Sequence, residues 1–449
     1  MIHSTRKMAP TSRSSLINAT KNRDEEKVKR LLEEGNVKVN QADEEGFTPL
    51  LTATVTGHAG IVELLLAIKD IDVNLSGTGG VTPLLMAVLN GHTKIVSLML
   101  EKEDIHVNLE TNGFGIPLII AAKKGHTEVI EMLLQHKSID VNKADSHGMT
   151  PLQAAIMKGY VEVVELLLKK EDLDVNCTIA NDGSTPLLMA VYANHAAIVE
   201  LLLSRKDVDM NKARTDGVAP LHIAVMNGHD KILSMMLEKE GLCVNMELKG
   251  LPPLYIGVLK GHVKVVELLL EYKDIDVNWA DKDGRTILSL AAQTGPAPQL
   301  KMLLQHEGTD VNKADSIGRT PLWIAASLGR AQVVELLLEH KDVDVTKACE
   351  KGVTPMAIAK DSVKPILRAK LKRPLNVSDT CVICLESVPD VVLLPCGHQN
   401  TCGVCAHEWN KWQKRCAVDR FMVTEILPLE KEEQAPSRKR PRLLTAEHK

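Results

Sequence analysis

The chain has 449 residues, a length that suits two or three ordinary domains or one extended array. Hydrophobic residues make up 44% and charged residues 25%, which is globular composition, whereas only 2% are aromatic, so many small aliphatic layers are favoured over one large core. The net charge of −4 argues against direct binding of nucleic acid, which depends on neutralising phosphates, and the absence of any apolar stretch of ~18 residues argues against a membrane span.

Residues 1–13 contain no apolar segment of the kind that a secretory signal requires, and we expect a flexible N-terminus there. From residue 14 to residue 373 the chain repeats one unit. The stretch "TPLLTATVTGHAGIVELLLAIKDIDVN" at 48–74 recurs as "TPLLMAVLNGHTKIVSLMLEKEDIHVN" at 82–108. Prolines mark the register every 33 to 35 residues, with Ile287 in the one missing place: Pro49, Pro83, Pro117, Pro151, Pro186, Pro220, Pro253, Pro321 and Pro355.

Each unit predicts two short helices. Thr-Pro opens the first, because the threonine hydroxyl can cap free amides and proline fits the first helical turn. A Gly-His step then supplies a left-handed turn. The second helix, as in "IVELLLAI", should place one apolar stripe at 3.6-residue spacing, made of Ile61, Leu64, Leu65 and Ile68. No unit buries its stripe alone, but stacked neighbours bury a continuous core.

The pattern resembles the ankyrin repeat through its T-P-L-x-x-A-A, G-H, V-V-x-L-L-L and D-V-N signatures. The resemblance implies a mainly α fold, an α-solenoid of about nine full units plus a cap at each end over residues 14–373. In one unit, "QTGPAPQL" puts Pro296 and Pro298 at the expected start of the second helix, so we expect that helix to be short or shifted. By analogy with ankyrin grooves, loop tips and first-helix positions are the candidate contacts to a protein substrate: Phe47, Met149, Arg285, Arg319 and Trp323.

Two periodic features have structural explanations. The recurring histidines, such as His58 and His92, lie in units about 10 Å apart and cannot share a metal ion, so we expect them to hydrogen-bond locally at helix starts. Paired acids such as Asp70 and Asp72 recur in nearly every unit, which indicates solvated loop residues. We find no Ser/His/Asp arrangement or phosphate loop in this region, which is expected to bind rather than to catalyse.

After a linker at 374–380, residues 381–420 contain six of the nine cysteines. The candidate metal ligands are, in order, Cys381, Cys384, Cys396, His398, Cys402, Cys405, Cys416 and Asp419. A Cys-x-x-Cys pair chelates one zinc ion through two thiolates, and two such pairs around a Cys-x-His pair are a strong zinc signal. Clustered cysteines in a chain without a secretory signal also favour a reduced compartment over a disulfide framework. Cys177, Cys243 and Cys349 stand apart and are interpreted as small apolar fillers or loop residues.

This order and spacing resembles the RING finger, a small α+β module stapled by two structural zinc ions, and "PCGH" looks most like the RINGs of inhibitor-of-apoptosis and mind-bomb proteins. Carried over by position, Cys381, Cys384, Cys402 and Cys405 hold the first zinc, and Cys396, His398, Cys416 and Asp419 hold the second. The resemblance implies a RING-type ubiquitin-protein ligase, with a ubiquitin-conjugating enzyme and ubiquitin as partners. Ile383, Trp409 and Trp412 match the positions that contact the conjugating enzyme, and Arg420 matches the residue that bridges it to ubiquitin.

Several alternatives stay open. The tryptophans could instead pack the core of the RING, and Arg420 could be merely solvated. Asp419 replaces a cysteine, and Ala417 replaces a proline that is common in active RINGs. These departures favour a competing hypothesis, a non-catalytic adaptor whose degenerate RING serves folding or dimerisation. A third and weaker hypothesis is a nuclear regulator whose array masks a transcription factor.

The tail spans residues 421–449. Its first part, "FMVTEILPL" at 421–429, alternates apolar residues, which is compatible with a strand that packs within its own module or with a strand that pairs two RINGs in a homodimer. A compact basic run, "SRKRPRLL" at 437–444, is a candidate for nuclear import. We therefore expect a cytoplasmic protein with a route to the nucleus.

Overall fold

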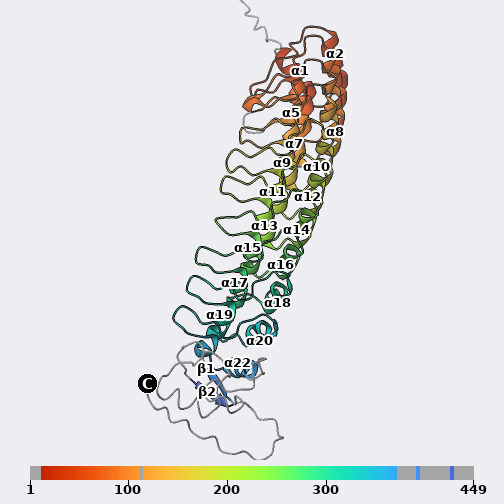
Figure 1. The fold of residues 1–449 in the computed structure, drawn as a ribbon. Coiled ribbons are helices and arrows are strands. Elements are labelled where there is room, and N and C mark those ends of the chain that lie inside the picture. The colour runs from red at the N-terminus through yellow and green to blue at the C-terminus, as the bar shows by residue number, and fades with distance from the viewer. Residues whose placement is uncertain (1–11, 112–114, 372–390, 395–424, 429–449) are drawn as a thin grey trace, which may run out of the picture. The chain divides into compact units, whose positions relative to one another are not determined.

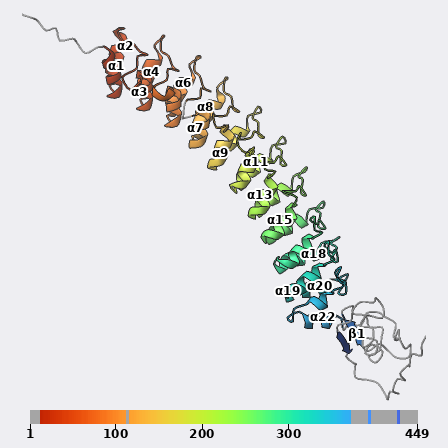
Figure 2. The same cartoon turned by 90° about the vertical axis from the view of Figure 1, so that its left-hand side faces the viewer.

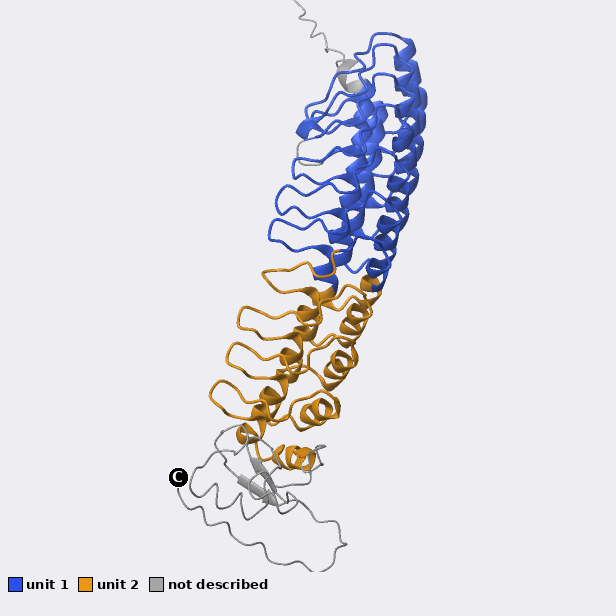
Figure 3. Ribbon diagram, viewed as in Figure 1, with its two compact units in different colours: residues 1–224, 234–242 blue, residues 225–233, 243–449 orange. Residues whose placement is uncertain are grey.

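The structure, a computed structural model, describes residues 12–111, 115–371, 391–394 and 425–428 (Figure 1). These residues form a succession of short helix pairs and one small two-stranded sheet. The chain divides into two compact units, residues 1–224 with 234–242 and residues 225–233 with 243–449 (Figure 3). Among the described residues, every helix is too short or too polar to cross a membrane.

Unit 1 contains two rows of helices, in which each helix packs on its partner in the other row and on its neighbours within its own row (Figures 1 and 2). The first row consists of α1 (Ser12–Lys21), α3 (Pro49–Val55), α5 (Pro83–Leu89), α7 (Pro117–Lys124), α9 (Pro151–Lys158) and α11 (Pro186–Tyr192). The second row consists of α2 (Glu25–Glu33), α4 (Ala59–Leu66), α6 (Thr93–Leu100), α8 (Thr127–Gln135), α10 (Val161–Leu168) and α12 (Ala196–Leu203). A 3₁₀ turn, η1, covers Thr78–Gly80.

Unit 2 repeats the same arrangement. Its first row consists of α15 (Pro253–Lys260), α17 (Ile287–Gln293), α19 (Pro321–Leu328) and α21 (Pro355–Ile358). Its second row consists of α16 (Val263–Leu270), α18 (Ala297–Gln305), α20 (Ala331–Glu339) and α22 (Lys364–Leu371). Helices α13 (Pro220–Asn227) and α14 (Asp230–Leu237) are each divided between the two units. The predicted mainly α repeat fold is confirmed over the described residues.

The first-row helices that follow a threonine begin as the Thr-Pro motif predicts, whereas α7 and α15, which follow Ile116 and Pro252, have no side-chain cap. In α3, the Thr48 hydroxyl accepts a hydrogen bond from the Leu51 amide at 3.1 Å, and Pro49 occupies the first turn. In α9, Thr150 forms a full capping box with Gln153. Each bond satisfies an amide that the helix itself leaves free, and together they fix where the first-row helices start.

Glycine ends several first-row helices in the left-handed region, as the Gly-His step predicts. Gly125 has φ 72° and Gly159 has φ 73°, values that a residue with a side chain adopts only with strain. At the corresponding place in α11 the chain has Asn194, with φ 56°, and asparagine is the residue that best tolerates this region after glycine. The reversal is therefore kept although its usual residue is absent.

The buried face of the second-row helices differs from the predicted stripe. In α4, Ile61 and Leu65 are buried as expected, but Val62 and Leu66 are buried with them, whereas Leu64 is half-buried. Ile68, which follows the helix, is also half-buried. The prediction was wrong because a second-row helix packs against its own partner and also against the helices before and after it, which widens the buried face to positions i, i+1, i+4 and i+5.

The prediction for the unit with two extra prolines was also wrong. Helix α18 has nine residues, as many as α8 and α20, and it starts at Ala297. Pro296 is its N-cap and Pro298 its second residue. Both prolines thus lie where an amide has no partner within the helix, so neither removes a helical hydrogen bond.

Candidate functional site

Every residue predicted to bind zinc or to contact the conjugating enzyme lies outside the described residues. These are Cys381, Cys384, Cys396, His398, Cys402, Cys405, Cys416, Asp419, Ile383, Trp409, Trp412 and Arg420. The linker at 374–380 and the basic run at 437–444 also lie outside them. Within the described ranges, no cluster of three His, Cys, Asp or Glu side chains could hold a metal ion.

The described part of the C-terminal region is an antiparallel strand pair. Strand β1 (Val391–Leu394) lies between the second and third candidate ligands in sequence, and β2 (Glu425–Pro428) follows the eighth. Val391 is paired with Pro428, and Leu394 with Glu425. The prediction of a strand within 421–429 is confirmed, and that strand pairs with its own chain. The pairing ties the segment after the last candidate ligand to a segment inside the ligand series.

Three of the five predicted substrate contacts come together in unit 2. Arg285, Arg319 and Trp323 line a groove of about 430 Å³ on the first-row helices, which we call the Trp323 groove. Its walls come from α15, α17 and α19 and from the loops that enter α17 and α19. Phe47 and Met149 lie in unit 1, half-buried in the loops that enter α3 and α9, and are not part of this groove.

Phe47 and Met149 have a structural role in their loops. The Phe47 amide donates to the Asp43 carboxylate at 2.8 Å, and the Met149 amide donates to the Asp145 carboxylate at 3.0 Å. Lys21 forms an ion pair with Asp43. Burial by itself would raise the pKa of the Asp43 carboxyl, but the hydrogen bonds from Lys21 and Phe47 together outweigh it, and the pKa is lowered. Both loops are therefore fixed by an aspartate that accepts backbone amides, as in an Asx turn.

The side chains of the Trp323 groove are held in place by their neighbours. The Arg319 Nε donates to the Asp315 carboxylate at 2.7 Å, and its guanidinium lies 5.8 Å from the centre of the Trp323 ring. The indole N–H of Trp323 donates to the Val353 carbonyl at 3.0 Å. On the opposite wall, Tyr255 packs edge-to-face on Trp279, with ring centres 5.3 Å apart. Burial raises the pKa of the Tyr255 phenol.

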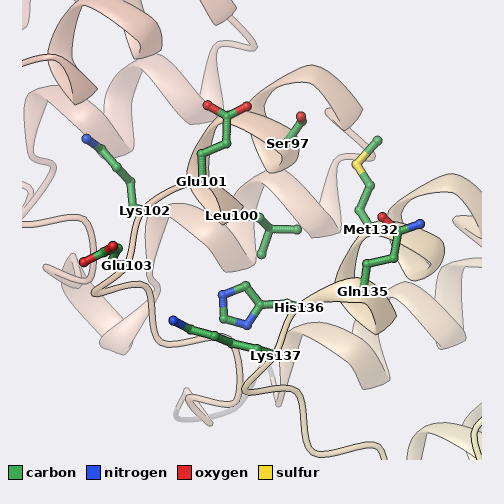
Figure 4. Close-up of a pocket in the computed structure, with 9 residues that line it drawn as sticks. All are labelled: Ser97, Leu100, Glu101, Lys102, Glu103, Met132, Gln135, His136 and Lys137. Carbon is green, nitrogen blue, oxygen red and sulfur yellow. The ribbon is translucent and has the colours of Figure 1, made fainter.

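A second depression, of about 380 Å³, lies between the ends of α6 and α8 in unit 1 (Figure 4). Leu100 and His136 lie near its centre, with Met132 on one side and Glu103 on the other. The His136 Nδ1 already accepts the amide of Ser138 at 3.2 Å. Both signs of charge are interleaved around this depression, and no group of like donors converges on one point, so it is a weaker candidate than the Trp323 groove.

The prediction that the periodic histidines hydrogen-bond locally was wrong for His126 and His262, whose rings reach back to the preceding repeat. The Nε2 of His126 lies 3.4 Å from the carbonyl of Leu89 in α5, and the Nε2 of His262 lies 3.1 Å from the carbonyl of Met226 in α13, in each case near the end of the first-row helix of the preceding repeat. No side-chain capping bond to their own helices is formed. The ring of His92 also lies against Gly57, where a Cβ would approach it to 3.0 Å. A glycine in one repeat therefore leaves room for the histidine ring of the next repeat.

An asparagine ladder runs along the loops and was missed by the sequence reasoning. In unit 1, the Asn142 Nδ2 donates to the Asp172 carbonyl at 2.6 Å, and its Oδ1 accepts the Asp174 amide at 2.8 Å. The same pair of bonds recurs from Asn40, Asn74, Asn108 and Asn176, and in unit 2 from Asn245, Asn278 and Asn312. Where two aspartates flank one residue, the second accepts a loop amide, so these acids fix the loop. The signal was the recurrent Asn of D-V-N.

The isolated cysteines are loop residues, as predicted. Cys177 and Cys349 are half-buried, Cys243 is exposed, and none of the three forms a disulfide. Burial raises the pKa of the Cys177 thiol, so this group is poorly suited to act as a nucleophile near neutral pH.

Comparison with known proteins identifies both parts of the chain. A family model described as ankyrin repeats (3 copies) matches overlapping segments that together span residues 16–369: 16–111, 66–145, 84–179, 173–247, 241–315 and 288–369. A model described as a zinc finger of C3HC4 type (RING finger) matches residues 377–426. The two models account for the repeat region and for the ligand series separately.

Two curated relatives match a short part of the chain. The E3 ubiquitin-protein ligases NEURL3 of Mus musculus and Rattus norvegicus are each 38% identical to it over 48 residues, which is 11% of this chain and 19% of theirs. Among solved structures, the ankyrin repeat domain of Bcl-3, a member of the IkappaB family, covers 49% of this chain and 97% of its own with 20% identity and a TM-score of 0.45. An ankyrin repeat domain of Acinetobacter baumannii covers 42% and 97%, with 28% identity and a TM-score of 0.40.

Proposed function

Because this chain belongs to the ankyrin-repeat proteins and carries a C-terminal RING finger of the C3HC4 type, we propose that it is a RING-type ubiquitin-protein ligase whose repeat array binds a protein substrate. The ligand series between Cys381 and Asp419, inside the segment that matches the RING model, is the observation that carries this proposal. The short similarity to E3 ubiquitin-protein ligases supports it.

The donor set fits zinc. Six thiolates, one imidazole and one carboxylate are the ligand types that zinc prefers, and they suffice for two four-coordinate sites. We assign Cys381, Cys384, Cys402 and Cys405 to the first ion and Cys396, His398, Cys416 and Asp419 to the second. Zinc supplies folding energy to such a module and takes no part in the reaction.

In the proposed mechanism, the RING orients the reactants. Ile383 and the tryptophans Trp409 and Trp412 would contact the ubiquitin-charged conjugating enzyme, and Arg420 would bridge that enzyme and its ubiquitin. A substrate lysine amine then attacks the thioester carbonyl, an amide bond forms, and the thiol of the conjugating enzyme leaves. The chain forms no covalent intermediate, and its rate gain comes from holding donor and acceptor in a reactive pose.

An autoubiquitination reaction tests this proposal. Full-length chain, activating enzyme, ATP, ubiquitin and a panel of conjugating enzymes should give ubiquitin chains on the ligase with at least one of those enzymes. The Ile383→Ala variant should lose this product, and Arg214→Gln, altered in unit 1, should keep it. If wild type forms no chains with any conjugating enzyme although zinc is bound, the ligase function is wrong.

A specific observation favours a second candidate function, that of a non-catalytic adaptor. The C3HC4 pattern ends in a cysteine, and this chain has Asp419 in that place. Zinc counting separates a substituted site from a lost one: we expect two ions per chain in wild type and one in Asp419→Ala. One ion in both proteins would mean that Asp419 binds nothing, and the adaptor would then be the better hypothesis.

A further inference from the structure

Arginine occurs at one register position in only two repeats, and the two are consecutive. Arg285 and Arg319 each lie two residues before the start of a first-row helix, α17 or α19. In the other repeats with a helix of this register the same position is uncharged, occupied by Phe47, Val81, Gly115, Met149, Ser184, Val218, Leu251 and Val353. The repeat itself therefore does not require a charge here, and the pair of arginines calls for a local explanation.

A hollow flanked by aromatic and leucine side chains lies beside the two arginines. At the third position of the first-row helix, α15 carries Tyr255, α17 carries Ser289 and α19 carries Trp323, so a small residue lies between two large aromatic ones. Leu259 and Leu328 also line the groove, and they remain 50% and 42% exposed. Exposed apolar side chains around a preformed hollow are typical of a binding surface.

The groove is also lined by uncharged polar residues, Gln293, Thr294 and Ser327, but its charged groups are all hydrogen-bond donors. Arg285 and Arg319 are the charged side chains among the residues that line it. Asp315, which pairs with Arg319, has a side chain that is 1% exposed and already accepts hydrogen bonds from the amides of Ile317 and Arg319 in addition to the Arg319 Nε. The two terminal nitrogens of Arg319 bond to no described residue. Arg285 bonds to Asp283 through one terminal nitrogen and is 48% exposed, so it too retains donors for a ligand.

We propose that the Trp323 groove binds an acidic segment of a partner protein in an extended conformation. A carboxylate of the segment accepts hydrogen bonds from Arg285 and Arg319, and an apolar side chain lies over Ser289 between Tyr255 and Trp323. Two helix-packing distances of roughly 8–10 Å separate α15 from α19, so the groove spans about five or six extended residues. This inference rests on the proposed function, in which the acidic segment is the recognition element of a ubiquitination substrate.

A binding measurement with matched peptides tests the proposal on the full-length chain. Three fluorescein-labelled pools of eight-residue peptides share one fixed leucine and differ only at two fixed positions, which are Glu, Gln or Lys. Fluorescence anisotropy should show that the Glu pool binds at least tenfold more tightly than the Gln pool, because a hydrogen bond between charged groups contributes roughly one to two powers of ten in affinity. The Lys pool should not bind.

Variants assign the binding to the groove. Arg285→Gln should weaken binding of the Glu pool at least tenfold, and Arg285→Glu should transfer the preference to the Lys pool. Ser289→Trp should abolish binding by filling the hollow. The control is Arg214→Gln, since Arg214 also pairs with an aspartate in a loop but lies outside the groove, and it should bind as wild type does. Thermal unfolding confirms that each variant is folded, and Arg285 is suited to replacement because it is exposed.

Three results would overturn the proposal. The Glu and Gln pools could bind equally, Arg214→Gln could weaken binding as much as Arg285→Gln, or a single-stranded oligonucleotide could bind more tightly than the Glu pool and lose affinity in Arg285→Gln. The last result would identify a nucleic-acid groove. No ubiquitin enzyme is present in this experiment, so peptide binding without ligase activity would refute only the proposed function. Ligase activity without peptide binding would refute only the acidic-segment site.

Discussion

Replacing Arg330 by alanine should loosen the end of α17 in unit 2. In this repeat Arg330 is the N-cap residue of α20, the position that histidine occupies before α8 and α16. Its guanidinium donates to the carbonyls of Ala291 at 3.2 Å, Ala292 at 3.0 Å and Gly295 at 2.6 Å. Burial lowers the pKa of the Arg330 guanidinium, so these bonds offset a cost of desolvation. Gly295 does not adopt the left-handed conformation that ends other first-row helices, so this helix end depends more on the hydrogen bonds from Arg330.

The magnitude follows from these contacts. A hydrogen bond from a charged donor contributes about 1.5–3 kcal/mol, but the half-buried site lets water replace part of each bond, so we expect a total loss of about 2–4 kcal/mol. Favourable interaction with the helix dipole is included in that figure. Arg330→His should recover about 1 kcal/mol, since histidine in the corresponding place reaches one carbonyl, as His262 does.

Amide hydrogen exchange read by mass spectrometry is the suitable assay, because repeat arrays open locally and need not unfold in two states. Amides of residues 287–295 in Arg330→Ala should exchange roughly 30-fold to several hundred-fold faster than in wild type, at 1.36 kcal/mol per tenfold change. The control is Lys301→Ala, on the exposed face of α18, which should leave exchange unchanged. If Arg330→Ala changes exchange in this segment less than about twofold, Arg330 does not hold the end of α17.

Two further variants test the packing of the array. Gln299 is fully buried, its Oε1 has no partner among the described residues, and its Nε2 reaches the Gly257 carbonyl only at 3.4 Å. Gln299→Met should therefore raise the free energy of unfolding by about 1–2 kcal/mol and the calorimetric Tm by several degrees. A lower Tm would mean that the amide is satisfied. Asn142→Ala removes both ladder bonds and should lower the free energy of unfolding in urea by about 1–3 kcal/mol. Lys143→Ala is the neutral control, and equal urea midpoints for the two variants would show that the ladder does not stabilise the array.

Features that depend on contacts within one helix were predictable from the sequence. The Thr48 cap joins residues three apart, and the positive φ of Gly125 belongs to a single residue. Both follow from local chemistry, which a repeat displays many times. The start of α18 was predicted wrongly because Pro296 and Pro298 were treated as helix breakers, although each lies at a position where the helix requires no amide.

Contacts between repeats were not predictable in the same way. Each asparagine of the ladder in unit 1 reaches across 30 to 33 residues, and His126 lies against the residue 37 positions before it. Residues so far apart in sequence come into contact only when one repeat stacks on the next, and the sequence of a single repeat contains no information on that stacking. The wider buried face of α4, which includes Val62 and Leu66, has the same origin.

Arg285, Arg319 and Trp323 were named from the sequence as candidate substrate contacts, and all three line the Trp323 groove, whereas Tyr255 and Ser289, which also line it, were overlooked. Substrate binding by this groove stays a prediction. A residue-by-residue alignment of the repeats on their first-row helices could have found these two, because the hollow results from a small residue in one repeat between aromatic residues in the repeats on either side. Differences in side-chain size at one register position thus predict a cavity that no single repeat shows.

The central claim is that the RING activates a ubiquitin-charged conjugating enzyme. Discharge of ubiquitin from that enzyme onto free lysine tests it most directly, because no substrate has to be known. Wild-type chain should accelerate discharge at least tenfold over the conjugating enzyme alone, Ile383→Ala should lose the acceleration, and Arg285→Gln in the array should keep it. Equal discharge with and without the zinc-loaded wild-type chain, for every conjugating enzyme in the panel, would contradict the claim.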